Sequence, residues 1–422
     1  MKVINLIYNY LFNLLFIIIL TIDLLYAQEY IDLLYIPDRF ESPAYEVLSE
    51  KSVDYPLVNK LNNPDKVAFK VNYRGHEAIA CIDINERGFN YSTLQYITSE
   101  SPRQQLMGKV KTIVNEYIWS PNGIRLIGYI DDRSSNNYKT ILYFDNQAHQ
   151  LIFERNLNSY RSNFYFINDN KILYRRKNML CTSMLGNLNI VDNDLFPCEM
   201  FGLSIFFINN SSKLLYFKYD KNNDAGIYFS NLNGSGHEKI INNPRFSEID
   251  PKISNNNLIA YASNQIDREI TNLREKDNLS NMFNLYVYDL SHNRTIKISN
   301  EYIRIKERRN DQFSEKNPIK WVDSKLFYML RDNTTSLVCW DQENNITYDI
   351  SSIIEGNITL RLFGWDNPPQ YRCRINQINN FDIFKINQGF YALISANIIL
   401  EQNDCSFNCR WKGDSLILFI RL

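Results

Sequence analysis

Short apolar runs separated by polar turns follow one another along most of this chain. In YIWSPNGIRLIGYI, at 117–130, Trp119 and an alternating apolar run flank the turn SPNG. A polar loop comes next, and then the run TILYFD, which ends in Asp145. Alternation of apolar and polar residues is typical of half-buried strands, and Asn-Gly is typical of a tight turn. The unit therefore predicts a strand, a turn, a strand, a loop and a third strand.

The same order returns about every 45 residues, which is the spacing of four-stranded propeller blades. Copies follow near Phe164, Phe207 and Ile253, and the copy at Trp321 is displaced by the polar insertion 264–281. Packing such sheets radially buries both faces of each one. We therefore expect an all-β fold, a β-propeller of about seven four-stranded blades, with six as the open alternative. The residues that mark the unit are Trp119, Ser120, Pro121, Asn122, Gly123, Asp145, Asp289, Trp321, Asp341 and Trp411.

The unit resembles the WSPDG…IAF…IYVMD blade of TolB-like propellers, a WD40-like repeat family. WSPNG, IRLIGYI and LYFD carry the resemblance, and PKISNNNLIAY…LYVYDL and CRWKGDSLILF are similar. In the last copy, Trp411 occupies the place of Trp119 before the turn. The resemblance covers 67–422 and implies a propeller and export, and its motif contains no catalytic residue. TolB-like proteins also carry an α/β domain ahead of the propeller, and we expect that domain to be missing here, since few residues separate Ala27 from Val67.

The first residues predict an export signal. Lys2 precedes an apolar run at 11–20, and the small Ala27 precedes polar residues, as at a signal-peptidase site. We expect cleavage after Ala27 and an exported, periplasmic or secreted protein without a lipid anchor or stable membrane span. The alternative is an uncleaved anchor, because the apolar stretch nearly reaches membrane-spanning length. The expected organisation is a signal peptide at 1–27, an extended segment at 28–66 that could close the propeller, and the propeller at 67–422.

The charge balance argues against a nucleic-acid partner, and the cysteine count bears on disulfides and zinc. The chain has 46 basic and 47 acidic residues, so it offers no positive field for nucleic acid. Seven cysteines leave at least one unpaired, and an exported protein permits disulfides. Cys405 and Cys409, in CSFNC, could pair locally, and no zinc-ligand spacing accompanies them.

Motifs of enzyme chemistry are sparse. The four histidines lie in different repeats, no phosphate-binding loop occurs, and the closest strings to GxSxG, at Gly202 and Gly234, do not match it. This argues against a prolyl-type peptidase. In DKNNDAG, Asp220, Asn222 and Asp224 have the alternating oxygen spacing of a calcium loop, but the bidentate Glu is missing. We favour a hairpin turn there, with a weak calcium site as the alternative.

The sequence therefore predicts an exported, monomeric propeller without catalytic residues, cofactor or metal, which binds a protein or peptide partner in the cell envelope. This prediction rests on the repeat architecture, the export signal and the scarcity of catalytic motifs. The alternative is a propeller enzyme, lactonase-like or glycoside-active, that uses carboxylates at the central channel. Because one fold hosts many functions, the fold alone does not decide between them.

Overall fold

Every regular element in the described part of the chain is a β-strand. The computed structural model describes residues 32–34, 51–73, 75–98, 112–132, 138–145, 150–154, 161–176, 179–184, 193–197, 201–208, 211–219, 224–241, 243, 246–265, 282–305, 308–309, 312–313, 319–331, 336–350, 356–358, 371–402 and 410–422. Within these ranges, no helix is long and apolar enough to cross a membrane. The fold is therefore all-β, as the alternating pattern predicts.

Strands that follow one another in sequence pair antiparallel, since short turns connect them. The first three sheets are β2 (Lys51–Val58), β3 (Lys66–Tyr73), β4 (His76–Asn85) and β5 (Gly88–Tyr96); β6 (Thr112–Trp119), β7 (Arg125–Asp132), β8 (Tyr138–Asp145) and β9 (Gln150–Glu154); and β10 (Arg161–Asn168), β11 (Lys171–Arg176), β12 (Met179–Met184) and β13 (Asn193–Pro197). The fourth to sixth sheets are β14 (Phe201–Ile208), β15 (Ser211–Tyr219), β16 (Ala225–Asn231) and β17 (Glu238–Ile241); β18 (Glu248–Ile253), β19 (Leu258–Ser263), β20 (Asn284–Asp289) and β21 (Arg294–Lys297); and β24 (Ile319–Val322), β25 (Lys325–Met329), β26 (Leu337–Asp341) and β27 (Ile346–Asp349). A small hairpin, β22 (Arg308–Arg309) and β23 (Gln312–Phe313), stands apart from them.

The last sheet joins the two ends of the chain. Its strands lie in the order β1-β31-β30-β29-β28, and their bounds are Asp32–Leu34 for β1, Gly356–Ile358 for β28, Tyr371–Ile386 for β29, Gly389–Gln402 for β30 and Arg410–Arg421 for β31. The short N-terminal strand β1 runs antiparallel to β31, with Leu33 opposite Leu418. The sheet is thus completed by a segment from the opposite end of the sequence.

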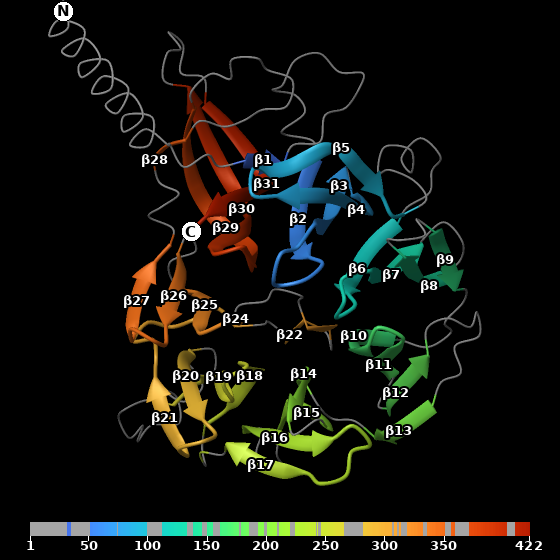
Figure 1. Cartoon of the computed structure of the whole chain (residues 1–422), viewed down its shortest axis with the longest axis vertical. Helices are drawn as coiled ribbons and strands as arrows, with labels where there is room; N and C mark the ends of the chain where they lie inside the picture. Colours follow the sequence, from blue (N-terminus) through green and yellow to red (C-terminus); the bar gives the residue numbers. More distant parts are fainter. Residues whose placement is uncertain are drawn as a thin grey trace, which may run out of the picture.

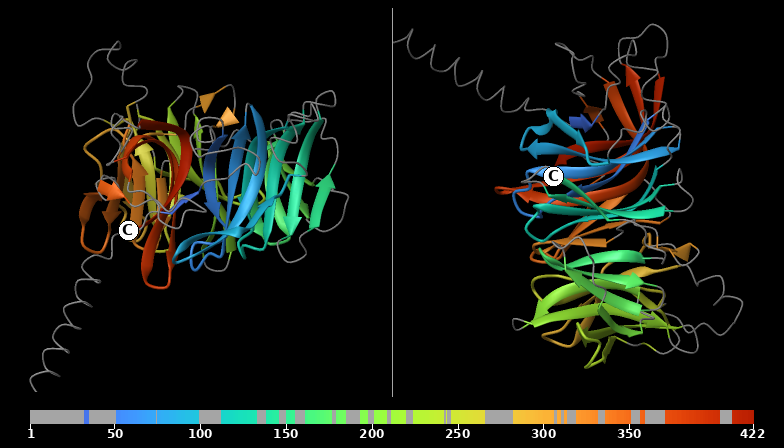
Figure 2. Two further views of the ribbon diagram at one scale, coloured as in Figure 1. Left: turned by 90° about the horizontal axis from the view of Figure 1, so that it is seen from above. Right: turned by 90° about the vertical axis from the view of Figure 1, so that its right-hand side faces the viewer.

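The sheets follow one another around a common centre, as in a β-propeller (Figure 1), and the side views show them standing side by side in one layer (Figure 2). Apolar clusters fill the junctions between neighbouring sheets. Each sheet shares a cluster with the next, and the last sheet shares one with the first, where Phe384 and Phe419 meet Val67 and Phe69. The core therefore lies between the sheets, which is why the strands are apolar on both faces.

Two local features differ from the sequence analysis. The first sheet starts at Lys51, ahead of the expected start of the propeller at Val67. Trp411 does not precede a turn, because it lies within β31 and pairs with Leu400. Gly413, expected in that turn, lies opposite Ile398 beside an irregularity in the ladder, so the extended pairing of β30 and β31 overrides the turn propensity of Lys-Gly-Asp.

Candidate functional site

The strand nearest the centre of the ring is the first strand in each of the first six sheets and β29 in the last sheet (Figure 1), and we call these the inner strands. In the described part of every sheet except the sixth, the ladder of the inner strand contains a register shift. Two shifts contain a residue with positive φ directly before a proline: Tyr55 before Pro56, and Asp250 before Pro251. Non-glycine residues rarely adopt this conformation, so the surrounding contacts must hold it.

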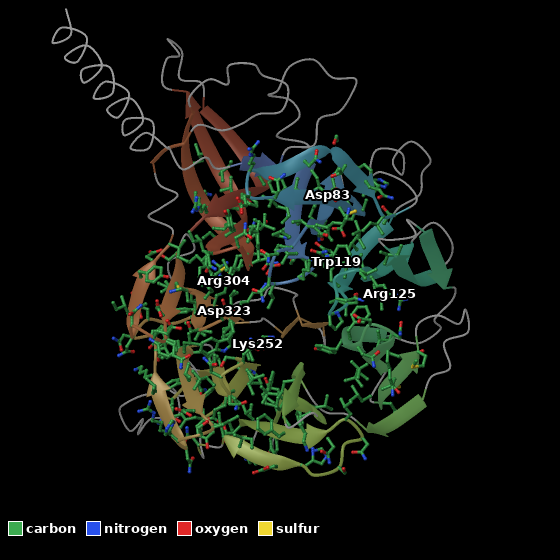
Figure 3. The ribbon with its side chains drawn as sticks, viewed as in Figure 1. Asp83, Trp119, Arg125, Lys252, Arg304 and Asp323 are labelled. Carbon is green, nitrogen blue, oxygen red and sulfur yellow. The ribbon has the colours of Figure 1, made fainter. Side chains whose placement is uncertain are left out.

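Tryptophan side chains bind these irregular segments from the next sheet. Trp119, at the end of β6, donates its indole N–H to the carbonyl oxygen of Leu57, which follows Pro56, at 3.0 Å. Trp321 in β24 donates in the same way to the carbonyl oxygen of Lys252, which follows Pro251, at 3.1 Å. We call these two contacts the tryptophan clasps. They join the first sheet to the second and the fifth to the sixth, and Trp119 and Lys252 lie close to the middle of the ring (Figure 3).

One buried carboxylate connects three inner strands. Asp382 in β29 is 2% exposed and accepts a hydrogen bond from the backbone N–H of Val58 in β2 at 2.8 Å. The same carboxylate forms an ion pair with Lys320 of β24. The Asp382 carboxylate therefore fixes the last sheet against both of its neighbours, at the place where the two ends of the chain meet.

The charge of Lys320 depends on that contact. Burial lowers the pKa of Lys320 to about 7, because the ammonium loses its hydration. The adjacent Asp382 carboxylate acts in the opposite direction and favours the charged amine. Removing either partner would leave the other charge buried and unpaired, which is far costlier than the pair itself.

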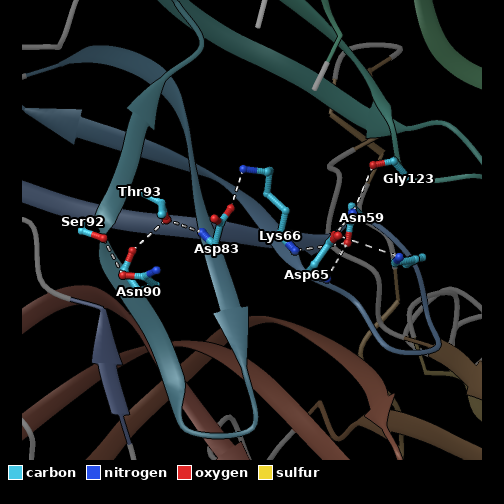
Figure 4. Close-up of polar contacts among 9 residues, drawn as sticks. Asn59, Asp65, Lys66, Asp83, Asn90, Ser92, Thr93 and Gly123 are labelled. Atoms are coloured by element: carbon cyan, nitrogen blue, oxygen red, sulfur yellow. Dashed lines mark hydrogen bonds and ion pairs between the residues drawn. The ribbon is translucent and has the colours of Figure 1, made fainter. Parts of the chain in front are cut away.

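The turns between the first and second strands form a polar belt on one side of the ring. Asn59 is its centre: its side-chain N–H group donates to Asp65 Oδ1 at 2.5 Å and to the carbonyl oxygen of Gly123 at 3.1 Å (Figure 4). Its side-chain oxygen accepts from the backbone N–H groups of Asp65 and Lys66. Gly123 has a φ of +71°, and a Cβ there would lie 2.7 Å from the Asn59 carbonyl oxygen, so this close approach requires glycine.

The belt continues through the neighbouring turns. Asn122 donates its backbone N–H to Asp169 of the third sheet at 2.9 Å. In the other direction, Lys385 of the last sheet exchanges backbone hydrogen bonds with the 61–63 segment of the first sheet and pairs with Asp323 of the sixth at 3.0 Å. Hydrogen bonds or ion pairs thus link consecutive turns from the sixth sheet through the last to the third.

The remaining residues singled out from the sequence have structural contacts. In the SPNG turn, the Ser120 hydroxyl oxygen accepts from Arg125 N and donates to Asn122 Oδ1, while Pro121 is exposed. Asp289 and Asp341 end the third strands of their sheets, and each accepts backbone N–H groups of the following turn. The pKa of both carboxyls is low: the side-chain hydrogen bond to His292 lowers it most for Asp289 and the one to Lys325 lowers it most for Asp341, and the turn N–H groups add to this.

Several predictions fall where the structure gives no side-chain description. Asp145 and Trp411 are placed by their backbone only, at the end of β8 and in β31. Asp220, Asn222, Cys405 and Cys409 lie outside the described residues. Asp224 is described and lies directly before β16. Because the other residues of both sites are not described, the calcium loop and the disulfide stay predictions.

Sequence reasoning missed Asp382, Lys320 and Glu248, a buried carboxyl at the start of β18. None lies in a recognisable motif, and each acquires its role from strands that are distant in sequence. The one available signal was a charged residue inside an apolar strand pattern, such as IKWV or FDIF.

Neither known family models nor curated proteins match this sequence. Solved structures do match the fold. A prolyl endopeptidase structure is similar with a TM-score of 0.51 at 10% identity, over 89% of this chain and 53% of that one. The propeller domain of the Trilobed protease from Pyrococcus furiosus is similar with a TM-score of 0.48 at 11% identity, over 86% of this chain and 98% of that one. This chain thus spans about half the length of the prolyl endopeptidase.

The likeness to the prolyl endopeptidase agrees with the β-propeller fold that the ring of four-stranded sheets shows, and it corrects the predicted function. The expectation of a non-catalytic envelope propeller that binds a partner is wrong, because the solved structure that this chain resembles over 89% of its length is a prolyl endopeptidase. The missing GxSxG motif does not separate this chain from that protein. The likeness covers 53% of the prolyl endopeptidase, and the rest of that protein has no counterpart in this comparison.

Proposed function

We propose that this chain is the propeller part of a peptidase of the prolyl endopeptidase type, and that it controls which peptides reach a catalytic part outside these residues. The likeness over 89% of this chain to a prolyl endopeptidase carries the proposal. Under this proposal the chain supplies no catalytic group. It contributes the ring and the inner strands past which an extended peptide would travel.

The proposal includes a seven-bladed ring closed by the N-terminal segment. In support, the described residues form six four-stranded sheets and one five-stranded sheet, in which β1 extends the C-terminal strands. Asp382, Lys385 and the apolar cluster around Phe384 all join the last sheet to the first. Under this proposal an unfolded segment would pass through the centre of the ring, and a folded protein would be excluded by its size.

The inner strands offer suitable groups for an extended peptide. Lys252, half-buried in β18 and close to the middle of the ring (Figure 3), is positively charged near the path we propose. The backbone irregularities of the inner strands interrupt regular pairing, and bulges of this kind are common beside functional sites. A peptide carboxylate or carbonyl oxygen could therefore bind at Lys252.

Peptide binding by the purified chain tests the proposal. Fluorescence anisotropy of labelled, unstructured peptides should show saturable binding that a folded protein does not compete for. Lys252→Ala should weaken it about tenfold, the effect of losing one charge-assisted contact. Lys297→Ala is the matched control, because Lys297 is also half-buried but lies on the outermost strand of the same sheet. Absence of binding, or equal loss in both variants, would refute the proposal.

Export and the TolB-like resemblance remain part of the proposal. The charge pattern at the N-terminus supports a signal peptide that ends at Ala27. N-terminal sequencing of the protein from its source tests this: a mature chain starting at Gln28 agrees with export, and retention of Met1 contradicts cleavage.

A further inference from the structure

Glu248 is a buried acidic residue, and both oxygens of its carboxyl group lack a regular hydrogen bond in the part of the chain that the structure describes. It begins β18 and is 0% exposed, and neither of its carboxyl oxygens accepts a hydrogen bond of normal geometry within the described residues, although the N–H groups of Asn243 lie close enough to lower its pKa. Buried carboxyl groups in native proteins are normally paired, hydrogen-bonded or bound to a metal. Asn243 alone does not bond these two oxygens with normal geometry, so a further ligand would complete their bonding.

The fourth sheet brings a second acid to the same place. Ala225 donates its backbone N–H to the Ser247 hydroxyl oxygen at 3.2 Å, so Asp224 and Glu248 each lie one residue from this bond. The negative charge of Asp224 is close enough to raise the pKa of Glu248 further, beyond the larger effect of burial. Around them lie the side chains of Asn243 and Gln265, whose amide groups bond to each other at 3.1 Å. The junction is therefore rich in oxygen atoms.

A proton alone does not resolve the anomaly. Burial raises the pKa of Glu248 to about 8, so the acid would be largely neutral near pH 7. A neutral carboxyl group could accept from Asn243, but its hydroxyl donor would still have no acceptor among the described residues. Lys239 is the nearby positive side chain, but its Nζ lies over the Tyr228 ring, 5.5 Å from the centroid, and no ion pair with Glu248 occurs between these described residues.

We propose that Glu248 and Asp224 bind a divalent cation, Ca²⁺, between the fourth and fifth sheets. Carboxylate, amide and hydroxyl oxygens are the ligands that Ca²⁺ takes, and Zn²⁺ would favour His or Cys. The described residues contain no group of three His, Cys, Asp or Glu side chains, so neutral oxygens and water would complete the coordination. Asp224 also belongs to the stretch DKNNDAG, where the sequence has the oxygen spacing of a calcium loop without its bidentate Glu.

Terbium luminescence and calcium titration of the purified full chain test this site. Tb³⁺ replaces Ca²⁺ in oxygen sites, and Tyr261, whose own pKa responds to Glu248, is a nearby sensitiser. Wild type should bind Tb³⁺ saturably, release it to Ca²⁺, and unfold at a higher temperature in Ca²⁺ than in a chelator. Glu248→Gln and Asp224→Asn should each weaken Ca²⁺ binding at least tenfold. Glu343→Gln, on an exposed turn of the sixth sheet, is the matched control and should not change it.

The results distinguish a carboxyl group that binds a cation from one that is only protonated. Binding that is lost in both site variants and kept in the control supports the proposal. Absence of saturable binding up to about 1 mM Ca²⁺, the weak end of extracellular calcium sites, overturns it. It is also overturned if Glu248→Gln binds Ca²⁺ as wild type does, or if stability depends on pH and not on Ca²⁺. Circular dichroism of each variant confirms folding, and the peptide-binding assay reports separately on the proposed function.

Discussion

The tryptophan clasps predict a specific loss of stability when the indole N–H is removed. In Trp119→Phe the ring remains apolar and aromatic, but the Leu57 carbonyl oxygen loses its donor from the second sheet. The carbonyl belongs to the irregular segment at Tyr55-Pro56, so the substitution also frees a backbone that adopts an unfavourable φ. The junction between the first and second sheets should therefore weaken before the sheets themselves do.

The magnitude follows from the hydrogen bond and from the lost volume. Leaving a partly buried carbonyl oxygen unpaired costs about 1–2 kcal/mol. The smaller ring removes further apolar contact at a side chain that is 9% exposed, which adds about 1 kcal/mol. Trp321→Phe breaks the equivalent clasp to Lys252 and should cost a similar amount. The two clasps join different pairs of sheets, so their effects should add within about 0.5 kcal/mol.

Trp340→Phe is the matched control. Trp340 is 5% exposed, but its indole N–H donates to the Asn345 side chain within the same sheet, and Asn345 is exposed and can bond to water instead. Urea unfolding followed by circular dichroism should show Trp119→Phe to be about 1 kcal/mol more destabilising than Trp340→Phe. Equal costs for the two substitutions would refute the clasp argument, because the loss would then be one of aromatic volume alone.

Other positions make independent predictions. Asp382→Asn should destabilise the chain by about 3–5 kcal/mol in urea, and adding Lys320→Met should recover most of it. In Asp382→Asn, the free energy of unfolding should rise between about pH 7 and the usual lysine pKa of 10.5. In that range Lys320 binds a proton in the unfolded chain and has released it in the folded one. A free energy of unfolding that does not change with pH would contradict this. Gly123→Ala should cost at least about 1 kcal/mol more than Gly236→Ala in thermal unfolding, because both have positive φ but only Gly123 lies against a neighbouring carbonyl oxygen. Asp341→Ala should remove about 1 kcal/mol, and the contribution of Asp341 should be lost on acidification as pH falls below its usual value of 3.8; equal destabilisation at pH 7 and pH 2 would contradict the turn role.

The strands and turns could be predicted because their causes are local. The SPNG turn uses a serine hydroxyl and an asparagine amide within the same few residues, and the side-chain partners of Asp341 among the described residues are its own turn and a facing lysine. Alternation of apolar residues then sets which positions are buried. For this reason the repeat of strand, turn, strand and Asp is visible in sequence, and it leads to the all-β fold that the structure shows.

The contacts between sheets could not be predicted in the same way. Asp382 bonds to Val58, which is 324 residues away, and nothing in FDIF indicates that partner. At Trp411 a local motif was misleading. The sequence there matches the start of a turn, but the pairing of β30 with β31 continues the strand through it. Register over many residues outweighs the preference of one Lys-Gly-Asp segment, since a slip would move every side chain of β31 to the other face.

The sheets are built alike, but the polar contacts that join neighbouring sheets differ from one junction of the ring to the next. Two junctions have tryptophan clasps, the junctions of the last sheet share the Asp382 carboxylate, and the fourth and fifth sheets meet at a carboxyl group without a described partner. A buried hydrogen-bonded group resists separation, whereas a buried unpaired carboxyl favours it unless a ligand binds. If the proposed cation site is correct, chelation should raise hydrogen exchange first at β16 and β18, while β2 and β29 stay protected. Equal exchange in all four strands would mean that the ring opens as one unit and that Glu248 has no local effect.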